Sequence, residues 1–192
     1  MNICVYAASS DALEAVYFDA AYELGTLLAA GGHRLVFGGG ATGLMGACAR
    51  GVIEHGGEAH GAAPRFFNEP GVLFFDGCSI LLTETMAQRK TYMAEKADAF
   101  IALPGGIGTY EEFFETLTLK ALGQHSKPMA LLNTAGYYEP FQELLHRTAA
   151  KGFMGRGVLD LYALCETPEE ALITVCSGAE TAPPRVLTDY GK

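Results

Sequence analysis

The chain has 192 residues, of which 49% are hydrophobic and 18% are charged, and its formal net charge is −9. This length fits one domain with a full hydrophobic core, and the composition excludes a disordered chain. A nucleic-acid polymer is not expected as a partner, because an acidic chain without a basic stripe cannot replace the counterions of the polymer. The negative net charge does not exclude a small phosphorylated ligand that is held by backbone N–H groups and one or two local cations.

No stretch approaches the roughly 20 consecutive apolar residues that cross a bilayer, so no membrane span is expected. The chain starts almost at once with a strand-like apolar segment and has no basic region before it, so no signal peptide is expected. Five scattered cysteines without a CxxC pair are typical of a reduced protein, which favours the cytoplasm. The five histidines lack metal-ligand spacing, and no metal is expected.

Short apolar segments alternate with helical patterns from one end of the chain to the other. Strands are predicted at residues 2–7, 34–38, 58–63, 78–83, 98–103, 128–132 and 161–165. Helices are predicted at about residues 12–30, 42–56, 85–97, 109–123, 138–150 and 168–177. This alternation predicts an α/β fold with a single domain, in which a Rossmann-like, doubly wound and mostly parallel sheet carries helices on both faces.

Two segments fall outside this alternation. Residues 64–77 form an irregular stretch that we expect to lie near the functional site. The catalytic, nucleotide-binding domain is predicted to cover residues 1–177, and residues 178–192, which contain Pro183 and Pro184, are predicted to form a C-terminal tail.

The first of two glycine-rich turns follows the second predicted strand and reads Gly38-Gly39-Gly40-Ala41-Thr42-Gly43. In sheets of this kind, ligands bind outside the carboxyl ends of the strands, where this turn would lie. It resembles a dinucleotide fingerprint only superficially, because it does not follow the first strand and no acidic residue closes the next one. Two interpretations stay open: Gly39 and Gly40 contact a ligand, or the glycines only let a helix pack closely on its strand.

The third predicted helix places two cations on the side that is meant for burial. At 100° per residue, Met86, Met93 and Ala97 fall on one narrow stripe. Lys90 lies inside this stripe and Arg89 borders it. Buried cations are costly unless an anion meets them, although long side chains also reach water from apolar stems. Because Arg89 starts a helix at the ligand-binding edge, its guanidinium is a candidate to bind a phosphate or a carboxylate.

The second glycine-rich turn joins the fifth predicted strand to the fourth predicted helix and is the most informative feature of the chain. It reads Pro104-Gly105-Gly106-Ile107-Gly108-Thr109. The start of a helix offers backbone N–H groups at the positive end of the helix dipole, and glycines let an anion approach them, so this turn suits a phosphate. The purely structural alternative is a tight turn with Thr109 as N-cap and Glu112 as its capping-box partner.

The helix after this turn has two distinct faces. Its apolar stripe is predicted to consist of Tyr110, Phe114, Leu117 and Ala121. Its reverse side is predicted to carry Glu112, Thr116 and Leu119. An apolar residue such as Leu119 on the second face predicts a partner subunit or a pocket wall. Glu112 would then lie in a partly enclosed place, where its carboxylate serves chemistry or only caps the helix.

Two of these motifs carry a resemblance to a known family. The pair Arg89-Lys90, followed by Pro104-Gly105-Gly106-Ile107-Gly108-Thr109-Tyr110-Glu111-Glu112, resembles the signature of the LOG ("lonely guy") family. The similarity runs from about Ile3 to Glu170. It implies a Rossmann-like fold and usually a homodimer with composite active sites. It also implies hydrolysis of the N-glycosidic bond of cytokinin riboside and other adenosine-type 5′-monophosphates to a free base and ribose 5-phosphate.

Carried over residue by residue, the resemblance implies that Arg89 and Glu112 are the catalytic residues. Substrate contacts are implied for Lys90, Gly105, Gly106, Ile107, Gly108, Thr109, Tyr110, Glu111 and Thr118, with Gly39 and Gly40 from the first turn. No cofactor is expected. Members of the family were once widely labelled lysine decarboxylases, but no pyridoxal-phosphate lysine motif accompanies the fold.

The chain departs from the family pattern in two places. Met86-Ala87 stands where many members have Met-His, and Ala7-Ala8-Ser9-Ser10 stands where Cys-Gly-Ser-Ser is common. These changes leave the arginine and the glutamate in place and bear on base preference and binding strength. The alternative function is that of a nucleotide- or cofactor-binding carrier of the same fold without hydrolase activity, in the manner of the molybdenum-cofactor carrier proteins.

Overall fold

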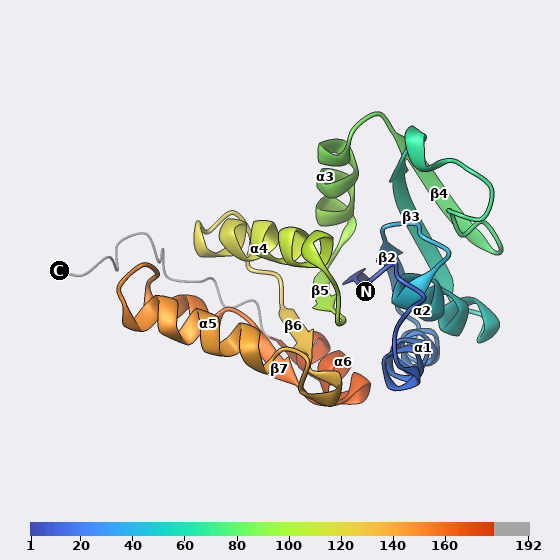
Figure 1. Cartoon of the computed structure of the whole chain (residues 1–192). Helices are drawn as coiled ribbons and strands as arrows, with labels where there is room; N and C mark the ends of the chain where they lie inside the picture. Colours follow the sequence, from blue (N-terminus) through green and yellow to red (C-terminus); the bar gives the residue numbers. More distant parts are fainter. Residues whose placement is uncertain (179–192) are drawn as a thin grey trace.

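A parallel sheet of seven strands forms the centre of the computed structural model, which describes residues 1–178 (Figure 1). The strands are β1 (Asn2–Tyr6), β2 (Arg34–Phe37), β3 (Glu58–Pro64), β4 (Cys78–Thr83), β5 (Ala99–Ala102), β6 (Met129–Leu132) and β7 (Ala163–Cys165). They lie in the order β4-β3-β2-β1-β5-β6-β7, and all six neighbouring pairs are parallel.

Six α-helices connect these strands. They are α1 (Ala15–Ala30), α2 (Gly43–Glu54), α3 (Met86–Lys96), α4 (Ile107–Ala121), α5 (Glu139–Ala150) and α6 (Pro168–Ser177). Short 3₁₀ turns are η1 (Arg65–Phe67), η2 (Thr134–Gly136) and η3 (Arg156–Asp160). The predicted fold class is therefore confirmed, and the elements agree with the predicted ones apart from shifts of their ends. Of the predicted tail, residues 179–192 lie outside the described part of the chain.

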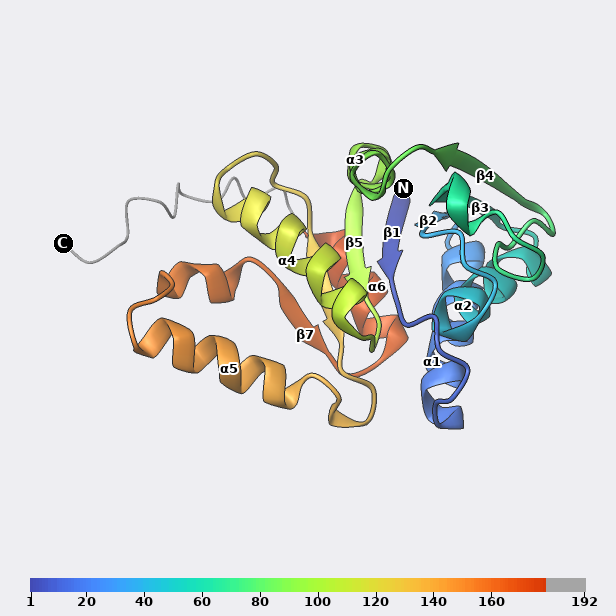
Figure 2. The ribbon, with the colours of Figure 1, turned by 45° about the horizontal axis from the view of Figure 1, so that its top comes forward.

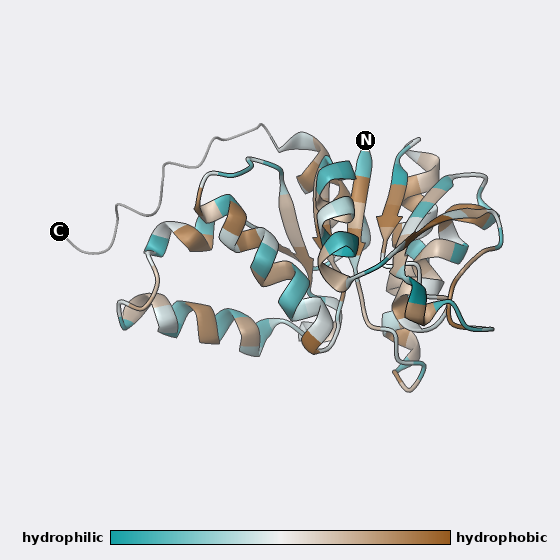
Figure 3. Ribbon diagram, turned by 90° about the horizontal axis from the view of Figure 1, so that it is seen from above, coloured by the Kyte–Doolittle hydropathy of each residue, from teal (hydrophilic) through white to brown (hydrophobic). Residues whose placement is uncertain are grey.

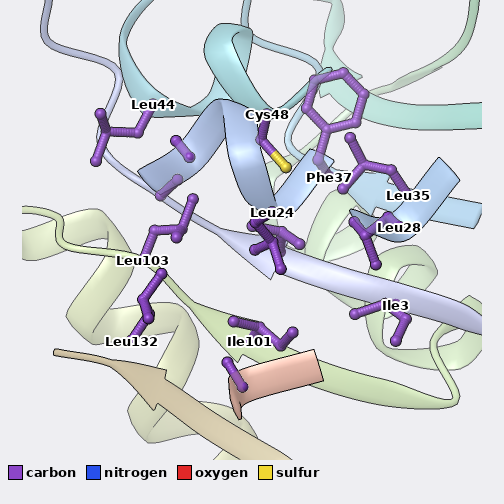
Figure 4. Packing of buried hydrophobic residues seen from close by; sticks show 14 of the residues in the cluster. Ile3, Leu24, Leu28, Leu35, Phe37, Leu44, Cys48, Ile101, Leu103 and Leu132 are labelled. Atoms are coloured by element: carbon purple, nitrogen blue, oxygen red, sulfur yellow. The ribbon is translucent and has the colours of Figure 1, made fainter. Parts of the chain in front are cut away.

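The sheet buries an apolar core on each of its two faces because successive side chains of a strand point to opposite sides. On β1, Ile3 and Val5 face one core, which α1, α2 and α6 cover (Figure 4). Cys4 and Tyr6 face the other core, which α3, α4 and α5 cover. Figure 3 shows this arrangement as mainly hydrophobic strands between helices that mix hydrophobic and hydrophilic stretches.

Helix α4 differs from its predicted form in two ways. It begins at Ile107, two residues before the predicted start. Phe113 is buried, whereas Phe114 of the predicted apolar stripe is exposed. Leu117 of the predicted stripe is buried, and Tyr110 and Ala121 pack against the core. The buried side also includes the polar residues Glu112 and Thr116, so the predicted stripe is only part of the buried face.

The irregular segment between β3 and β4 is tied to the first glycine turn. The Ala41 N–H donates to the Val72 carbonyl, and the Phe74 N–H donates to the Gly39 carbonyl, each at 2.9 Å. Leu73 forms an antiparallel bridge with Gly40 between these two bonds. The segment therefore lies beside the first glycine turn, at the carboxyl edge of the sheet where the functional site is expected. Among the helices of residues 1–178, none is both long and apolar enough to cross a membrane.

Candidate active site

A cavity of about 530 Å³ opens at the carboxyl edge of the sheet. The turns after β1, β2 and β5 line it, together with residues of the segment 65–77 and the first residues of α3 and α4. In Figure 2 the arrowheads of β1 and β5 point to this edge, where α4 starts. The two glycine-rich turns, which are separated by more than one strand–helix unit in the sequence, therefore meet at one cavity.

Arg89 of α3 forms part of the cavity wall and is only 6% exposed. Its Nε donates to the carbonyl oxygen of Ala62 on β3, 3.1 Å away. Its Nη1 donates to the carboxylate of Glu112 on α4. The guanidinium is thus held from both sides, and the carboxylate offsets the cost of burying the cation.

Gly38 leaves the space that this guanidinium occupies. A Cβ atom at position 38 would lie 1.9 Å from Nη2 of Arg89, so any larger residue would displace the arginine. The first glycine turn therefore has a role that neither sequence interpretation included: it makes room for a catalytic candidate, and not only for a ligand or a packed helix.

Glu112 is 8% exposed and lines the cavity beside Arg89. Burial raises the pKa of its carboxyl group above the usual value, although the Arg89 charge opposes this shift. The capping interpretation is wrong, because Gly106 is the N-cap of α4 and no side chain caps it. Thr109 is the third residue of the helix and Glu112 lies deeper inside it, so the carboxylate is available for chemistry.

Residues Gly106–Thr109, the N-cap and first three residues of α4, line the same cavity and are called the phosphate turn. The first amides of a helix have no partner within the helix and lie at the positive end of its dipole. Gly105 lets the Thr109 side chain fold back against the turn, since a Cβ atom at Gly105 would lie 2.1 Å from Thr109 Oγ1. The turn therefore combines the features of a phosphate site.

Lys90 and Glu111 lie apart from this turn. The Lys90 Nζ donates to the carboxylate of Glu111 and lies 2.7 Å from a carboxylate oxygen of Glu115. These hydrogen bonds raise the pKa of Lys90. Lys90 lines a second cavity of about 300 Å³, which it shares with Glu112 and Glu115. The structure thus places Lys90 on the α3–α4 side of Glu112, away from the phosphate turn.

Four further predicted residues lie outside the lining of the larger cavity, namely Gly105, Tyr110, Thr118 and Gly39. The ring of Tyr110 stacks on Phe141 with centroids 5.5 Å apart and an interplanar angle of 5°. Thr118 is exposed on α4. Gly39 lies behind the cavity surface, whereas its neighbour Gly40 lines the cavity. For every predicted site residue, those in the cavity lining included, contact with a substrate stays a prediction.

Sequence reasoning missed the apolar part of the cavity. Its lining includes Met45, Phe67, Val72, Leu73 and Met86. Three of these residues follow β3, and the order of the strands brings them to the same edge as the glycine turns. The sequence does not state the strand order, which arises only when the sheet packs. The irregular sequence of the segment was the one signal that placed it near the site.

Together these residues form a site with three chemical parts. The phosphate turn suits an anion, the Arg89–Glu112 pair supplies a cation and a carboxylate, and the remaining wall is apolar. Within residues 1–178, no three His, Cys, Asp or Glu side chains gather as a metal-binding group. The arrangement can hold a phosphorylated ligand and place a carboxylate beside it.

Comparisons with known proteins bear on the family of the chain. A family model described as "Possible lysine decarboxylase" matches residues 45–175. The cytokinin riboside 5′-monophosphate phosphoribohydrolase LOG of Oryza sativa subsp. japonica is 39% identical over 172 residues, which cover 90% of this chain and 71% of the relative. The cytokinin riboside 5′-monophosphate phosphoribohydrolase of Rhodococcoides fascians is 40% identical over 162 residues, which cover 84% of this chain and 82% of the relative.

Solved structures with lower identity share the fold. The molybdenum cofactor carrier protein of Chlamydomonas reinhardtii matches with a TM-score of 0.69 and 22% identity, over 91% of this chain and 95% of that one. The molybdenum cofactor binding protein of Rippkaea orientalis matches with a TM-score of 0.69 and 23% identity, over 92% of this chain and 95% of that one. The family model and the curated relatives confirm the resemblance of the motifs, and the chain belongs to the LOG family of phosphoribohydrolases, enzymes that hydrolyse an N-glycosyl bond.

Proposed function

We propose that this chain hydrolyses the N-glycosidic bond of cytokinin riboside 5′-monophosphates, and also of AMP, and releases the free base and ribose 5-phosphate. The observation that carries the proposal is the buried Arg89–Glu112 pair in the wall of the cavity that contains the phosphate turn. Relatives that are named for this reaction support it. A carrier protein that only binds a nucleotide has no need of a buried carboxylate at this place.

The proposed reaction uses each part of the cavity. The turn Gly106–Thr109 binds the 5′-phosphate, and this contact supplies binding energy remote from the broken bond. Cleavage of an N-ribosidic bond builds positive charge on the sugar, as glycoside hydrolysis does. The Glu112 carboxylate stabilises this charge and orients the attacking water. Arg89 fixes the carboxylate and assists the departure of the base.

Incubation with isopentenyladenosine 5′-monophosphate and with AMP tests the proposal. Chromatography should detect isopentenyladenine and adenine that increase with time and with protein concentration. A protein that binds both nucleotides but releases no base would instead be a carrier.

The raised pKa of Glu112 predicts the pH dependence of catalysis. Because the ionised carboxylate is the active form, kcat/KM should increase with pH as Glu112 loses its proton. The midpoint of this increase should lie above about 4.3, the usual pKa of a glutamate. Measurement of kcat/KM from acid to neutral pH provides the test, and a midpoint at or below the usual pKa would assign the titration to another group.

Gly38→Ala should move this midpoint to higher pH and lower turnover. The added methyl group displaces Arg89, and Glu112 then loses the charge that lowers its pKa. Two other charged residues act on Glu112: Glu111 raises its pKa and Lys90 lowers it, and both stay in place.

Gly57→Ala is a matched control for Gly38→Ala. A Cβ atom at Gly57 would also be crowded, at 2.8 Å from Val52 and 2.9 Å from Ala29, but neither side chain lines the cavity. The control should lower stability without a change in the midpoint. An unchanged midpoint in a folded Gly38→Ala protein would show that Arg89 does not need the space at Gly38.

We also propose that the chain forms a homodimer through α4. Leu119 is 36% exposed and lines the smaller cavity together with Phe100 and Ala94. Phe114 and Thr118 are exposed on the same helix. A partner that covers this helix would bury the apolar side chains, and Thr118 would then reach a nucleotide only across the interface.

Light scattering should report about twice the chain mass of 20.4 kDa. Leu119→Glu should yield a monomer, because it places a charge in the contact. An active monomeric parent at micromolar concentration would contradict the proposal.

A further inference from the structure

The loops along the cavity follow the order of the strands. Because β3, β2, β1 and β5 are consecutive neighbours in the sheet, the segment after β3 and the turn after β5 lie at opposite ends of the ligand-binding edge. The turns after β2 and β1 lie between them. All four loops contribute to the lining of the larger cavity.

The two ends of the cavity differ in chemistry. The end after β5 carries the backbone amides of the phosphate turn. The end after β3 carries Phe67, Val72 and Leu73, with Met86 from α3 beside them. Arg89 bridges the two ends, since its Nε binds a β3 carbonyl and its Nη1 binds Glu112 of α4. A nucleotide has its parts in the same order, with the phosphate at one end, the ribose in the middle and the base at the other.

Among the side chains at the apolar end, Phe67 is the most exposed, slightly more so than Met86 at 39%. It lies on η1 directly after β3, lines the cavity and is 41% exposed. The wall beside it is fixed by the hydrogen bonds of Val72 and Phe74 to the first glycine turn. Its neighbour Phe66 is 59% exposed, with ring centroids 4.6 Å apart, but Phe66 does not line the cavity. An exposed aromatic ring in the lining of a preformed cavity is typical of a ligand contact.

We propose that Phe67 is a specificity-determining residue, which binds an apolar substituent on the base and so selects prenylated adenine nucleotides over AMP. This inference rests on the proposed hydrolase function and names the side chain that sets its base preference. A prenyl group that packs on Phe67 removes apolar surface of both partners from water, whereas the amino group of AMP leaves the ring exposed.

The test compares kcat/KM for isopentenyladenosine 5′-monophosphate and for AMP. The parent should favour the prenylated nucleotide by about tenfold or more, the range expected when a few carbon atoms are buried in an apolar pocket. Phe67→Ala should lower this ratio by about tenfold while the value for AMP changes by less than about threefold. Phe67→Leu, which keeps an apolar side chain, should retain most of the preference.

Phe66→Ala is the matched control, since it removes the adjacent ring that does not line the cavity. It should leave the ratio unchanged. Ile107→Ala and Met86→Ala test the other two exposed, large apolar side chains of the cavity lining, at the phosphate end and at the apolar end. The proposal is overturned if the parent has no preference, if Phe67→Ala lowers both values equally, or if one of these three variants removes the preference instead of Phe67→Ala.

A binding measurement separates this proposal from the hydrolase function. In the Glu112→Gln background, calorimetry should give the two dissociation constants without turnover. The ratio of these constants should fall with Phe67→Ala as the kcat/KM ratio does. If the parent releases no base but Phe67→Ala still abolishes a binding preference, the hydrolase function fails and the role of Phe67 stands. If the parent releases base and Phe67→Ala does not change the ratio of dissociation constants, the hydrolase function stands and the role of Phe67 fails.

Discussion

Glu112→Gln is expected to lower turnover by roughly 100-fold or more, the scale of the loss of a positioned acid–base group. The substitution removes the negative charge that an oxocarbenium-like transition state requires, and it keeps an oxygen that accepts the hydrogen bond from Arg89. Nucleotide binding should survive, because the phosphate turn is unchanged. Steady-state kinetics and calorimetric binding of isopentenyladenosine 5′-monophosphate provide the two measurements.

The fold of this variant is expected to persist. The free energy of unfolding should change by less than about 2 kcal/mol, because two effects oppose each other. The substitution removes the attraction between Glu112 and Arg89, but it also removes the cost of burying the Glu112 carboxylate. Burial raises the folded-state pKa of Glu112, so its stabilising contribution is complete below the unfolded-state pKa and is lost as the pH rises through the folded-state value. The glutamine does not titrate, so the parent should lose stability relative to this variant as the pH rises, and melting curves at acid and neutral pH provide the measurement.

Glu115→Gln is the control for the loss of a carboxylate from the same helix. Glu115 pairs with Lys90 and does not line the larger cavity. The turnover of the Glu115→Gln protein should stay within about twofold of the parent, because a surface ion pair contributes little free energy. Near-normal turnover in a folded Glu112→Gln protein would leave Glu112 as a structural partner of Arg89. The search for the catalytic carboxylate would then move to Glu111, which pairs with Lys90, or to Glu84, which follows β4 and pairs with Arg65.

The 5′-phosphate is expected to raise kcat/KM by about 100- to 10,000-fold, which corresponds to two charge-assisted hydrogen bonds from the phosphate turn. Isopentenyladenosine and its 5′-monophosphate differ only in this group. The physical reason is that the free amides and the dipole of α4 bind an anion, while the nucleoside leaves them without a partner.

Release of free base from both compounds under identical conditions measures the effect of the phosphate. Inorganic phosphate should inhibit the cleavage of the nucleoside only weakly, because it lacks the connection to the ribose. Equal rates for nucleoside and monophosphate would remove the role that Gly106–Thr109 have in the proposed reaction.

The strand–helix alternation made the fold predictable, because parallel strands that are buried on both faces consist of short apolar runs. The buried face of α4 was predicted only in part, because Leu117 of the predicted stripe is buried but Phe114 is exposed. A search for the most apolar stripe selects Phe114, but the helix turns Glu112 and Thr116 inward, where the carboxylate meets Arg89. Local patterns fail where a polar residue is buried for a functional purpose.

The members of the candidate site were predictable one by one, and their arrangement was not. Arg89 was unusual as a cation on a buried stripe, and Glu112 as a carboxylate behind a glycine turn. Their contact depends on the packing of α3 beside α4, 23 residues further along the chain. The need for Gly38 depends on the position of a guanidinium in space. The proposed role of Phe67 in base preference depends on the strand order, which brings the segment after β3 to the cavity.

Product analysis of isopentenyladenosine 5′-monophosphate is the most direct measurement of the proposed reaction. Mass spectrometry of a completed reaction should find isopentenyladenine and ribose 5-phosphate in equal amounts, and the Glu112→Gln protein should form neither at a comparable rate. Formation of isopentenyladenosine and inorganic phosphate, or recovery of the intact nucleotide from the parent protein, would contradict cleavage of the N-glycosidic bond at this site.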